Sequence, residues 1–103
     1  MVLRLLFSGR AKPDYLSDAL TLLPGWTREG EQIRRTLVLD DSQHAALTER
    51  IKVVSDALRV RPEISRRADR TQIQVGHGNA PLTEGEVLLA ARIEDAFRTV
   101  ADS

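Results

Sequence analysis

Strict alternation of apolar and polar residues from Thr71 to Val75 is the clearest pattern in the chain, and it predicts a β-strand with one buried face. A second alternating segment runs from Ile33 to Leu39, with Arg35 on its apolar side. We expect Arg35 to lie beyond the buried part of that strand. Shorter strands are predicted at residues 26–28 and 63–67, beside residues typical of turns and connections. The pattern therefore predicts four strands.

Three other segments repeat apolar residues every three or four positions, which is the spacing of an amphipathic helix. They lie between Pro13 and Leu23, between Ser42 and Pro62, and between Thr83 and Val100. The resulting order is helix, strand, strand, helix, strand, strand, helix. This order predicts an α+β domain with its helices on one face of an antiparallel sheet.

The predicted ends of the second and third helices carry capping signals. Residues 40–42 offer side-chain oxygens that can accept backbone N–H groups where the second helix begins, and Pro62 is expected to end it. Thr83 and Glu86 have the residue types and the spacing of a capping box, in which each side chain bonds the other residue's amide. This local role is the simplest explanation of Glu86.

The second predicted helix is apolar over more than half of its girth. One stripe is formed by Leu47, Ile51, Val54 and Leu58, and a second flank is formed by Ala46, Val53 and Ala57. A helix of this kind usually contacts two surfaces. We therefore expect it to pack both on its own sheet and on a partner chain.

The composition indicates an ordinary single-domain globular protein. A length of 103 residues suits one domain, and 42% hydrophobic and 29% charged residues are typical of such a domain. A domain of this size has a modest core, so association into homo-oligomers is expected. A formal net charge of zero and 4% aromatic residues argue against nucleic acid as a partner. No apolar run approaches the length needed to cross a membrane.

The chain has no cysteine, which excludes disulfides, thiol catalysis and cysteine-based zinc sites. Two distant histidines do not make a set of metal ligands, so neither a metal nor another cofactor is expected. The apolar start from Met1 to Phe7 lacks the features of a secretory signal. We predict that residues 1–12 form an extra N-terminal strand or arm, and that the protein is cytoplasmic.

Four short motifs follow one another with plausible gaps. They are Leu23-Pro24-Gly25-Trp26, Arg59-Val60-Arg61-Pro62, the strand from Thr71 to His77, and the segment from Leu82 to Ala90. In this order they resemble the pterin-4a-carbinolamine dehydratase family, whose members carry a Pro-Gly-Trp opening, an Asn-His-His-Pro block, a strand ending in Thr-His and a Gly-Leu-Thr…Asp…Leu-Ala helix start. The resemblance implies a four-stranded antiparallel sheet covered on one side by three helices. It also implies a homodimer, which in some members pairs into a tetramer.

The same resemblance places the family's essential imidazoles at positions 60, 61 and 77, and a carboxylate near position 86. The family removes a hydroxyl group from carbon 4a of a reduced pterin, so one proton must be delivered and another removed. Imidazole suits both steps, because its ordinary pKa of about 6.5 is close to neutral. Here Val60 cannot carry a proton, and Arg61 is always protonated and cannot act as a base. We therefore expect a vestigial pocket of Val60, Arg61, Pro62, His77 and Glu86, with no catalytic residues.

Simpler explanations exist for each of the remaining candidate residues. His77 lies between two glycines, where an exposed loop histidine needs no function. His44 falls in the first turn of a predicted helix and is expected to face solvent, and Trp26 is expected in the core.

Arginines are concentrated around the altered block. They are Arg59, Arg61, Arg66, Arg67 and Arg70, against two acidic residues, Glu63 and Asp69. Such a local excess is most often a solvated edge. It could also be a docking surface for carboxylates of a protein partner, because arginine suits bidentate pairs and is enriched at interfaces.

Two functions of different classes follow from the resemblance. The first is a non-catalytic protein, similar to the assembly factors of ribulose-bisphosphate carboxylase (RuBisCO) that are associated with α-carboxysomes of bacteria. The second is an active 4a-hydroxytetrahydrobiopterin dehydratase that uses His77 and Glu86. A third role, as a regulatory partner that aids dimerisation of a transcription factor, is known in the family and is singled out by no motif here.

Overall fold

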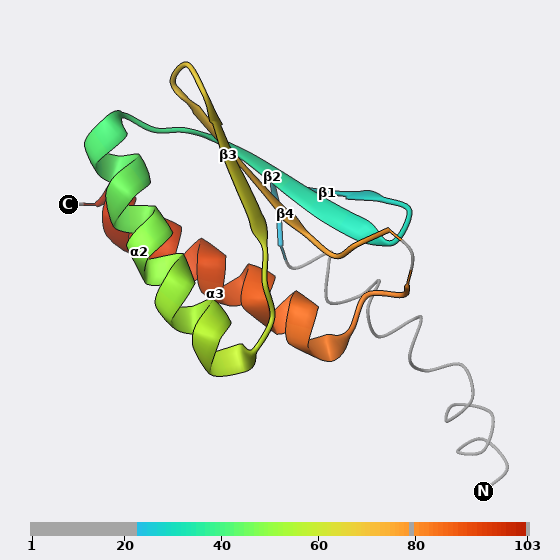
Figure 1. The fold of residues 1–103 in the computed structure, drawn as a ribbon. Helices are drawn as coiled ribbons and strands as arrows, with labels where there is room; N and C mark the ends of the chain where they lie inside the picture. Colours follow the sequence, from blue (N-terminus) through green and yellow to red (C-terminus); the bar gives the residue numbers. More distant parts are fainter. Residues whose placement is uncertain (1–22, 79, 103) are drawn as a thin grey trace, which may run out of the picture.

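The computed structural model describes residues 23–78 and 80–102, and the four predicted strands form one antiparallel sheet in it (Figure 1). The strands are β1 (Trp26–Glu29), β2 (Gln32–Val38), β3 (Glu63–Arg67) and β4 (Arg70–Val75). Their order in the sheet is β1-β2-β4-β3, so β1 and β3 form its two edges within the described residues. The prediction of four antiparallel strands is confirmed.

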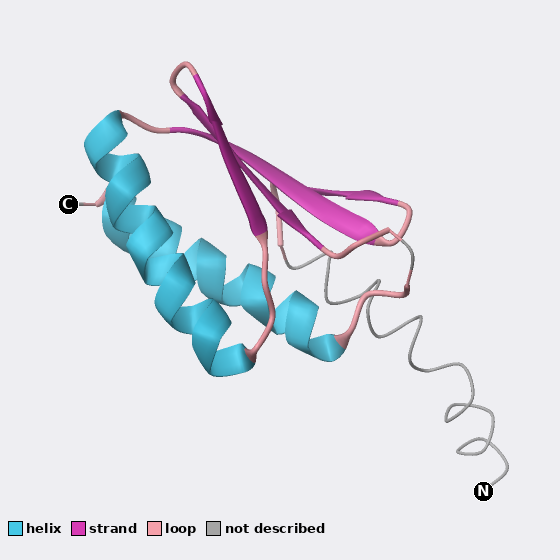
Figure 2. Cartoon of the chain, viewed as in Figure 1, coloured by secondary structure: helices cyan, strands magenta, loops and turns pink. Residues whose placement is uncertain are grey.

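Two helices, α2 (Asp41–Leu58) and α3 (Glu84–Ala101), cover the same face of the sheet (Figure 2). The described elements thus follow the order β-β-α-β-β-α, which confirms the α+β class and two of the three predicted helices. The helix predicted between Pro13 and Leu23 falls outside the described residues except for Leu23, which is buried. The strand or arm predicted at residues 1–12 also lies outside them.

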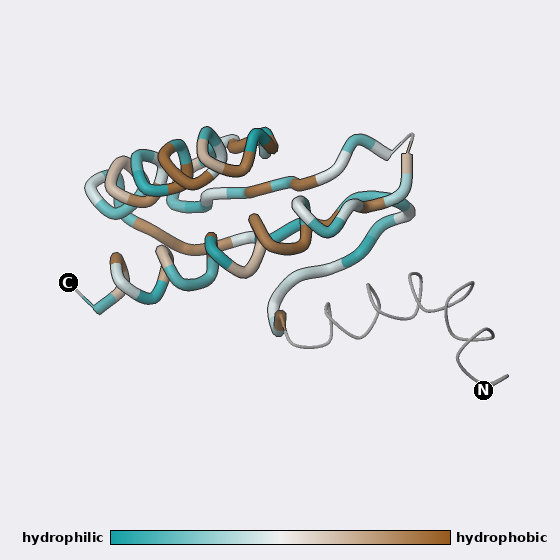
Figure 3. The backbone as a smooth tube through the Cα atoms, turned by 90° about the horizontal axis from the view of Figure 1, so that it is seen from below, coloured by the Kyte–Doolittle hydropathy of each residue, from teal (hydrophilic) through white to brown (hydrophobic). Residues whose placement is uncertain are grey.

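The core lies between the sheet and the two helices. Alternation along β4 turns Thr71, Ile73 and Val75 towards the helices, and none of the three is more than 1% exposed. Each helix contributes the stripe predicted for it, and in Figure 3 hydrophobic and hydrophilic residues alternate along both. The stripe residues that are buried or packed against the core are Leu47, Ile51, Val54 and Leu58 of α2 and Leu89, Ile93, Phe97 and Val100 of α3.

Both helices begin with the predicted caps. Asp40 Oδ1 accepts the Gln43 N–H at 2.7 Å, and Gln43 Oε1 accepts the Asp40 N–H at 3.0 Å. In α3, Thr83 Oγ1 accepts the Glu86 N–H at 3.1 Å, and Glu86 Oε1 accepts the Thr83 N–H at 2.8 Å. These bonds satisfy backbone donors that a helix start otherwise leaves without partners.

The end of α2 differs from the prediction, because the helix stops at Leu58 and not at Pro62. Arg59 adopts a left-handed conformation with φ of 58°, and its N–H donates to the Ser55 carbonyl. The Val60 N–H also donates to that carbonyl, at 3.1 Å. Left-handed residues close helices in this way, and they are usually glycine or asparagine. An arginine gives no such signal in the sequence.

The prediction for Arg35 is wrong. Its side chain lies on the helix-facing side of β2, where Nε donates to Glu94 Oε1 of α3 at 2.7 Å. Trp26 Nε1 donates to the same oxygen at 2.8 Å, and the Arg35 guanidinium lies 5.6 Å from the centre of the Phe97 ring. Glu94 is only 7% exposed. A buried carboxylate supplied by α3 therefore allows a charge on the apolar side of the strand.

The second apolar flank of α2 faces away from the sheet. Val53 is 68% exposed, and Ala46 and Ala57 are also exposed. The flank is thus available to another chain, and its contact with a partner stays a prediction.

Candidate functional site

One end of the sheet brings together the three segments that sequence analysis assigned to the vestigial pocket. Glu63 pairs with Gln74, so the residues just before β3 lie beside the end of β4, where the loop carrying His77 begins. The start of α3 lies there as well, because a Cβ added to Gly85 would be 3.4 Å from Val60 Cγ2. The three segments therefore lie at the same end of the sheet, and their grouping into one pocket stays a prediction.

Val60 and Arg61 occupy different surroundings at this end of the sheet. Val60 is half-buried and packs against the core beside the first turn of α3. Arg61 is exposed, and no described residue forms an ion pair with it. The first histidine position of the family's Asn-His-His-Pro block thus holds a packed hydrocarbon side chain, and the second holds a cation that faces solvent.

Glu86 is engaged in the cap of α3. It is 9% exposed, and its Oε1 accepts the Thr83 N–H at 2.8 Å. The bond satisfies a backbone donor at the start of the helix, and an acidic side chain in the first turn complements the positive end of the helix dipole. The structure therefore supports the capping role of Glu86.

His77 is exposed in the loop between β4 and α3. Its neighbours Gly76 and Gly78 have φ of 101° and 82°, and a Cβ on Gly76 would lie 2.7 Å from the Glu31 carbonyl oxygen. The loop therefore packs closely against the β1–β2 turn, which requires glycine at position 76. Among the described residues, none forms a hydrogen bond or an ion pair with the imidazole. Within residues 23–78 and 80–102, no hydrogen-bonding or charged partner thus orients His77 for proton transfer.

A groove of about 450 Å³ runs between α2 and β3 next to this site. Arg61 and Pro62 form one end of it, and α2 contributes Lys52 and Asp56. The remaining lining residues are Thr48, Ile51, Ser55 and Ile64. Sequence analysis did not find the residues of α2 as site residues, because their common direction depends on where β3 packs.

Comparison with known proteins assigns the chain to a family. The family described as "Pterin 4 alpha carbinolamine dehydratase" matches residues 10–96. The chain belongs to the pterin 4 alpha carbinolamine dehydratase family. It is 27% identical over 82 residues to a protein of Thermomicrobium roseum named "Putative pterin-4-alpha-carbinolamine dehydratase", a match that covers 78% of this chain and 88% of the relative.

A solved structure has the same fold. It is a transcriptional coactivator/pterin dehydratase from Brucella melitensis, with a TM-score of 0.70 at 21% identity, and the match covers 79% of this chain and 90% of that one. At this identity the likeness speaks for the fold alone. The pterin-dehydratase-like fold predicted from the four motifs is confirmed for the sheet and two helices.

The five arginines do not form one patch in this family member. Arg66 turns towards the helices, where NH2 donates to Asp41 Oδ1 at 2.9 Å and NH1 donates to Thr71 Oγ1 at 3.0 Å. The same threonine oxygen lies 2.8 Å from His44 Nδ1, and His44 is half-buried. The prediction that His44 faces solvent is therefore wrong, because the residue ties α2 to β4.

The other four arginines separate into two pairs along β3. Arg59 and Arg61 precede the strand, and Arg67 and Arg70 lie at its far end, where they are directly opposite each other in the β3–β4 register. All four are exposed, and none of them forms an ion pair with a described residue. The altered block and the hairpin are thus two distinct positive regions.

Two further tests concern metal and membrane. Within residues 23–78 and 80–102, no group of three or more His, Cys, Asp or Glu side chains could hold a metal ion. Over that same part of the chain, no helix has the length and apolar character needed to cross a bilayer.

Proposed function

We propose that this protein is a non-catalytic member of the pterin 4 alpha carbinolamine dehydratase family that acts by binding another protein. The observation that carries the proposal is the half-buried Val60 beside an exposed Arg61, at the two positions where the resemblance expects imidazoles. Neither side chain can both give and take a proton near neutral pH.

The two remaining candidates do not compensate for this change. Glu86 is held in the cap of α3, and His77 has no described partner that would orient it. A positioned general acid or base typically contributes about 100- to 10,000-fold to a rate. Without the two imidazoles and with an unoriented third, little acceleration over the reaction in solution is expected.

The partner in this proposal is RuBisCO, with the protein serving as an assembly factor in α-carboxysome systems. Support comes from the resemblance to that non-catalytic branch and from the retained scaffold. The role needs only a rigid body that offers a complementary surface, as a homodimer in the cytoplasm. The exposed flank of α2 and the two arginine pairs are surfaces that such a body would have available.

Turnover of 4a-hydroxytetrahydropterin separates this function from the enzymatic one. The purified protein is compared with a family member that has the Asn-His-His-Pro block and with a blank without protein. We expect the rate of the blank. Robust turnover that disappears in the His77→Ala variant would establish the active dehydratase instead.

A second experiment tests the partner. RuBisCO subunits are co-expressed with and without this protein, and the assembled soluble carboxylase is measured on native gels and by activity. We expect a higher yield in its presence, and an unchanged yield would exclude RuBisCO as the client.

A further inference from the structure

The outer face of the β3–β4 hairpin, opposite to the helices, carries a pair of arginines that form no ion pair with any described residue. Arg67 ends β3 and Arg70 begins β4, and the two are register partners. Their neighbours Arg66 and Thr71 point towards the helices, so alternation turns Arg67 and Arg70 outwards. Both are exposed. The pair is therefore presented to solvent on a two-stranded support.

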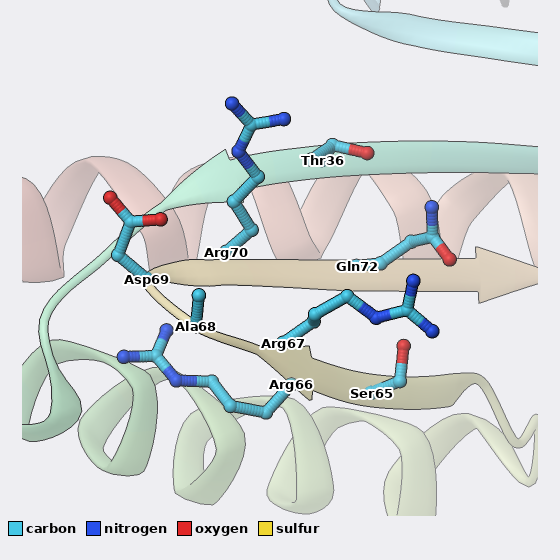
Figure 4. A pocket seen from close by; sticks show the side chains of 8 residues that line it. All are labelled: Thr36, Ser65, Arg66, Arg67, Ala68, Asp69, Arg70 and Gln72. Carbon is cyan, nitrogen blue, oxygen red and sulfur yellow. The ribbon is translucent and has the colours of Figure 1, made fainter.

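A shallow depression of about 550 Å³ surrounds the pair (Figure 4). Thr36, Gln72 and Ser65 line it as a row across three strands, because Gln72 pairs with Thr36 of β2 on one side and with Ser65 of β3 on the other. These side chains are uncharged donors and acceptors. The depression thus combines two cations with a hydrogen-bonding floor.

The electrostatics of the pair favour an added anion. Like charges directly opposite each other in an antiparallel sheet destabilise it. No described residue forms an ion pair with either arginine; Asp69, in the turn between them, lines the depression but forms no ion pair with them. Carboxylates placed between the two guanidinium groups would remove the repulsion and could accept bidentate bonds.

The shape and chemistry of the face indicate an extended segment more than a small anion. The row of Thr36, Gln72 and Ser65 lies parallel to the row of Val38, Arg70 and Arg67, two residues further along the strands, so a chain bound over the arginines could also bond to it. Val38 pairs with Arg70 and is 68% exposed, which offers an apolar contact next to the cations. The described part of this face has no aromatic side chain on which a nucleic-acid base could stack.

The hairpin that carries the pair is anchored to the body of the domain. The Leu39 N–H, at the junction of β2 and α2, donates to the Asp69 carbonyl at 2.9 Å, and Arg66 bonds Asp41 at the start of α2. The arginines therefore project from a fixed support.

We propose that the outer face of this hairpin binds an acidic, partly apolar segment of the partner protein, with Arg67 and Arg70 as its carboxylate-binding residues. This inference rests on the proposed function and names the chemistry of the partner that it requires.

The test measures binding of a fluorescein-labelled peptide, Glu-Leu-Glu-Glu-Leu-Glu, to the full chain by fluorescence anisotropy. The double variant Arg67→Thr/Arg70→Thr is compared with Arg59→Asn/Arg61→Thr, which removes the same charge at the other end of β3 and puts asparagine, a residue that tolerates the left-handed conformation, at position 59. We expect at least about tenfold weaker binding for the hairpin variant and less than about twofold for the control. Equal losses in the two variants, or no binding by the parent, would overturn the proposal.

Two further measurements keep the result interpretable. Thermal unfolding of the hairpin variant should occur at an equal or higher temperature than that of the parent, because a like-charge pair is removed and threonine suits strands. A single-stranded oligonucleotide of equal charge should bind more weakly than the peptide, and stronger binding would overturn the peptide assignment. The turnover and co-expression experiments read out the proposed function separately, so a failed peptide test with raised carboxylase yield would reject this surface alone.

Discussion

Arg35 of β2 and Glu94 of α3 form an ion pair of 2.7 Å inside the layer between sheet and helices. Their side chains are 19% and 9% exposed, and the same Glu94 oxygen accepts the Trp26 indole N–H. Removing one partner of a buried pair leaves the other charge uncompensated. This contact therefore holds β1, β2 and α3 together at one place.

The first prediction concerns this pair. Glu94→Gln keeps the size of the side chain but leaves Arg35 without a counter-charge, and we expect a loss of about 3 kcal/mol in the free energy of unfolding. Urea denaturation measures it. The neighbouring Asp95→Asn removes an exposed pair with Arg98, and it should cost less than about 0.5 kcal/mol. Similar effects of the two substitutions would contradict the assigned role.

We predict that position 25 must be glycine, because it lies against the cluster of Arg35, Glu94 and Trp26. The φ of Gly25 is 94°, and a Cβ there would overlap the Arg35 guanidinium. Gly30 also has a positive φ, of 62°, but a Cβ there meets nothing within 4 Å. Gly30→Ala should therefore cost about 1 kcal/mol for backbone strain alone, and Gly25→Ala should cost clearly more. Thermal melts of both variants decide this, and an equal cost would show that Arg35 does not constrain position 25.

The hydroxyl of Thr71 is predicted to matter beyond its volume. It is 1% exposed and bonds both Arg66 and His44. Thr71→Val keeps the shape but leaves these polar groups without this partner, so we expect a loss of about 1–3 kcal/mol. Thr36→Val, on the exposed face of β2, should change the free energy of unfolding by less than about 0.5 kcal/mol. Denaturant titration of the two variants compares them, and a neutral Thr71→Val would mean that the network contributes nothing.

Restoring the two imidazoles tests whether their absence explains the expected lack of dehydratase activity. The double variant Val60→His/Arg61→His should turn over 4a-hydroxytetrahydropterin at least about 100-fold faster than the parent protein. Adding His77→Ala should remove that gain, which serves as the control. A parent rate as high as that of the double variant would show that positions 60 and 61 do not limit the reaction.

Local patterns predicted the parts of the fold that depend on neighbours in sequence. The strand from Thr71 to Val75 and the capping box of Thr83 and Glu86 each need only a few consecutive residues, and both are present as expected. The order of the elements and the family motifs then fixed the α+β class.

Contacts between distant residues could not be predicted in the same way. The alternating pattern predicts Arg35 outside the core, because a charged residue ends a run of buried positions in such a pattern. Its partner Glu94 lies 59 positions further on, so the pattern gives no sign of it. His44 was assigned to solvent because its bond to Thr71 joins residues 27 positions apart. Arg59 closes α2 although its residue type gives no sign of a left-handed conformation.

In the candidate site, too, some features followed from motifs in the sequence, and others depended on contacts between distant residues. The resemblance implied one vestigial pocket of Val60, Arg61, Pro62, His77 and Glu86. The fold brings their segments to one end of the sheet, and the pocket itself stays a prediction. The groove residues of α2, including Lys52 and Asp56, could not be predicted from the sequence, because the groove exists only where β3 packs beside α2. The separation of Arg67 and Arg70 from Arg59 and Arg61 likewise required the register of the hairpin.

The bond from the Leu39 N–H to the Asp69 carbonyl has a consequence for how a client would be released. A pre-ordered hairpin loses little conformational entropy on association, so it gains little conformational entropy on dissociation. Dissociation would then be timed by the client, whose own folding or subunit assembly withdraws the acidic segment from solution. If the hairpin binds a client as proposed, its release would thus not require the hairpin to become disordered.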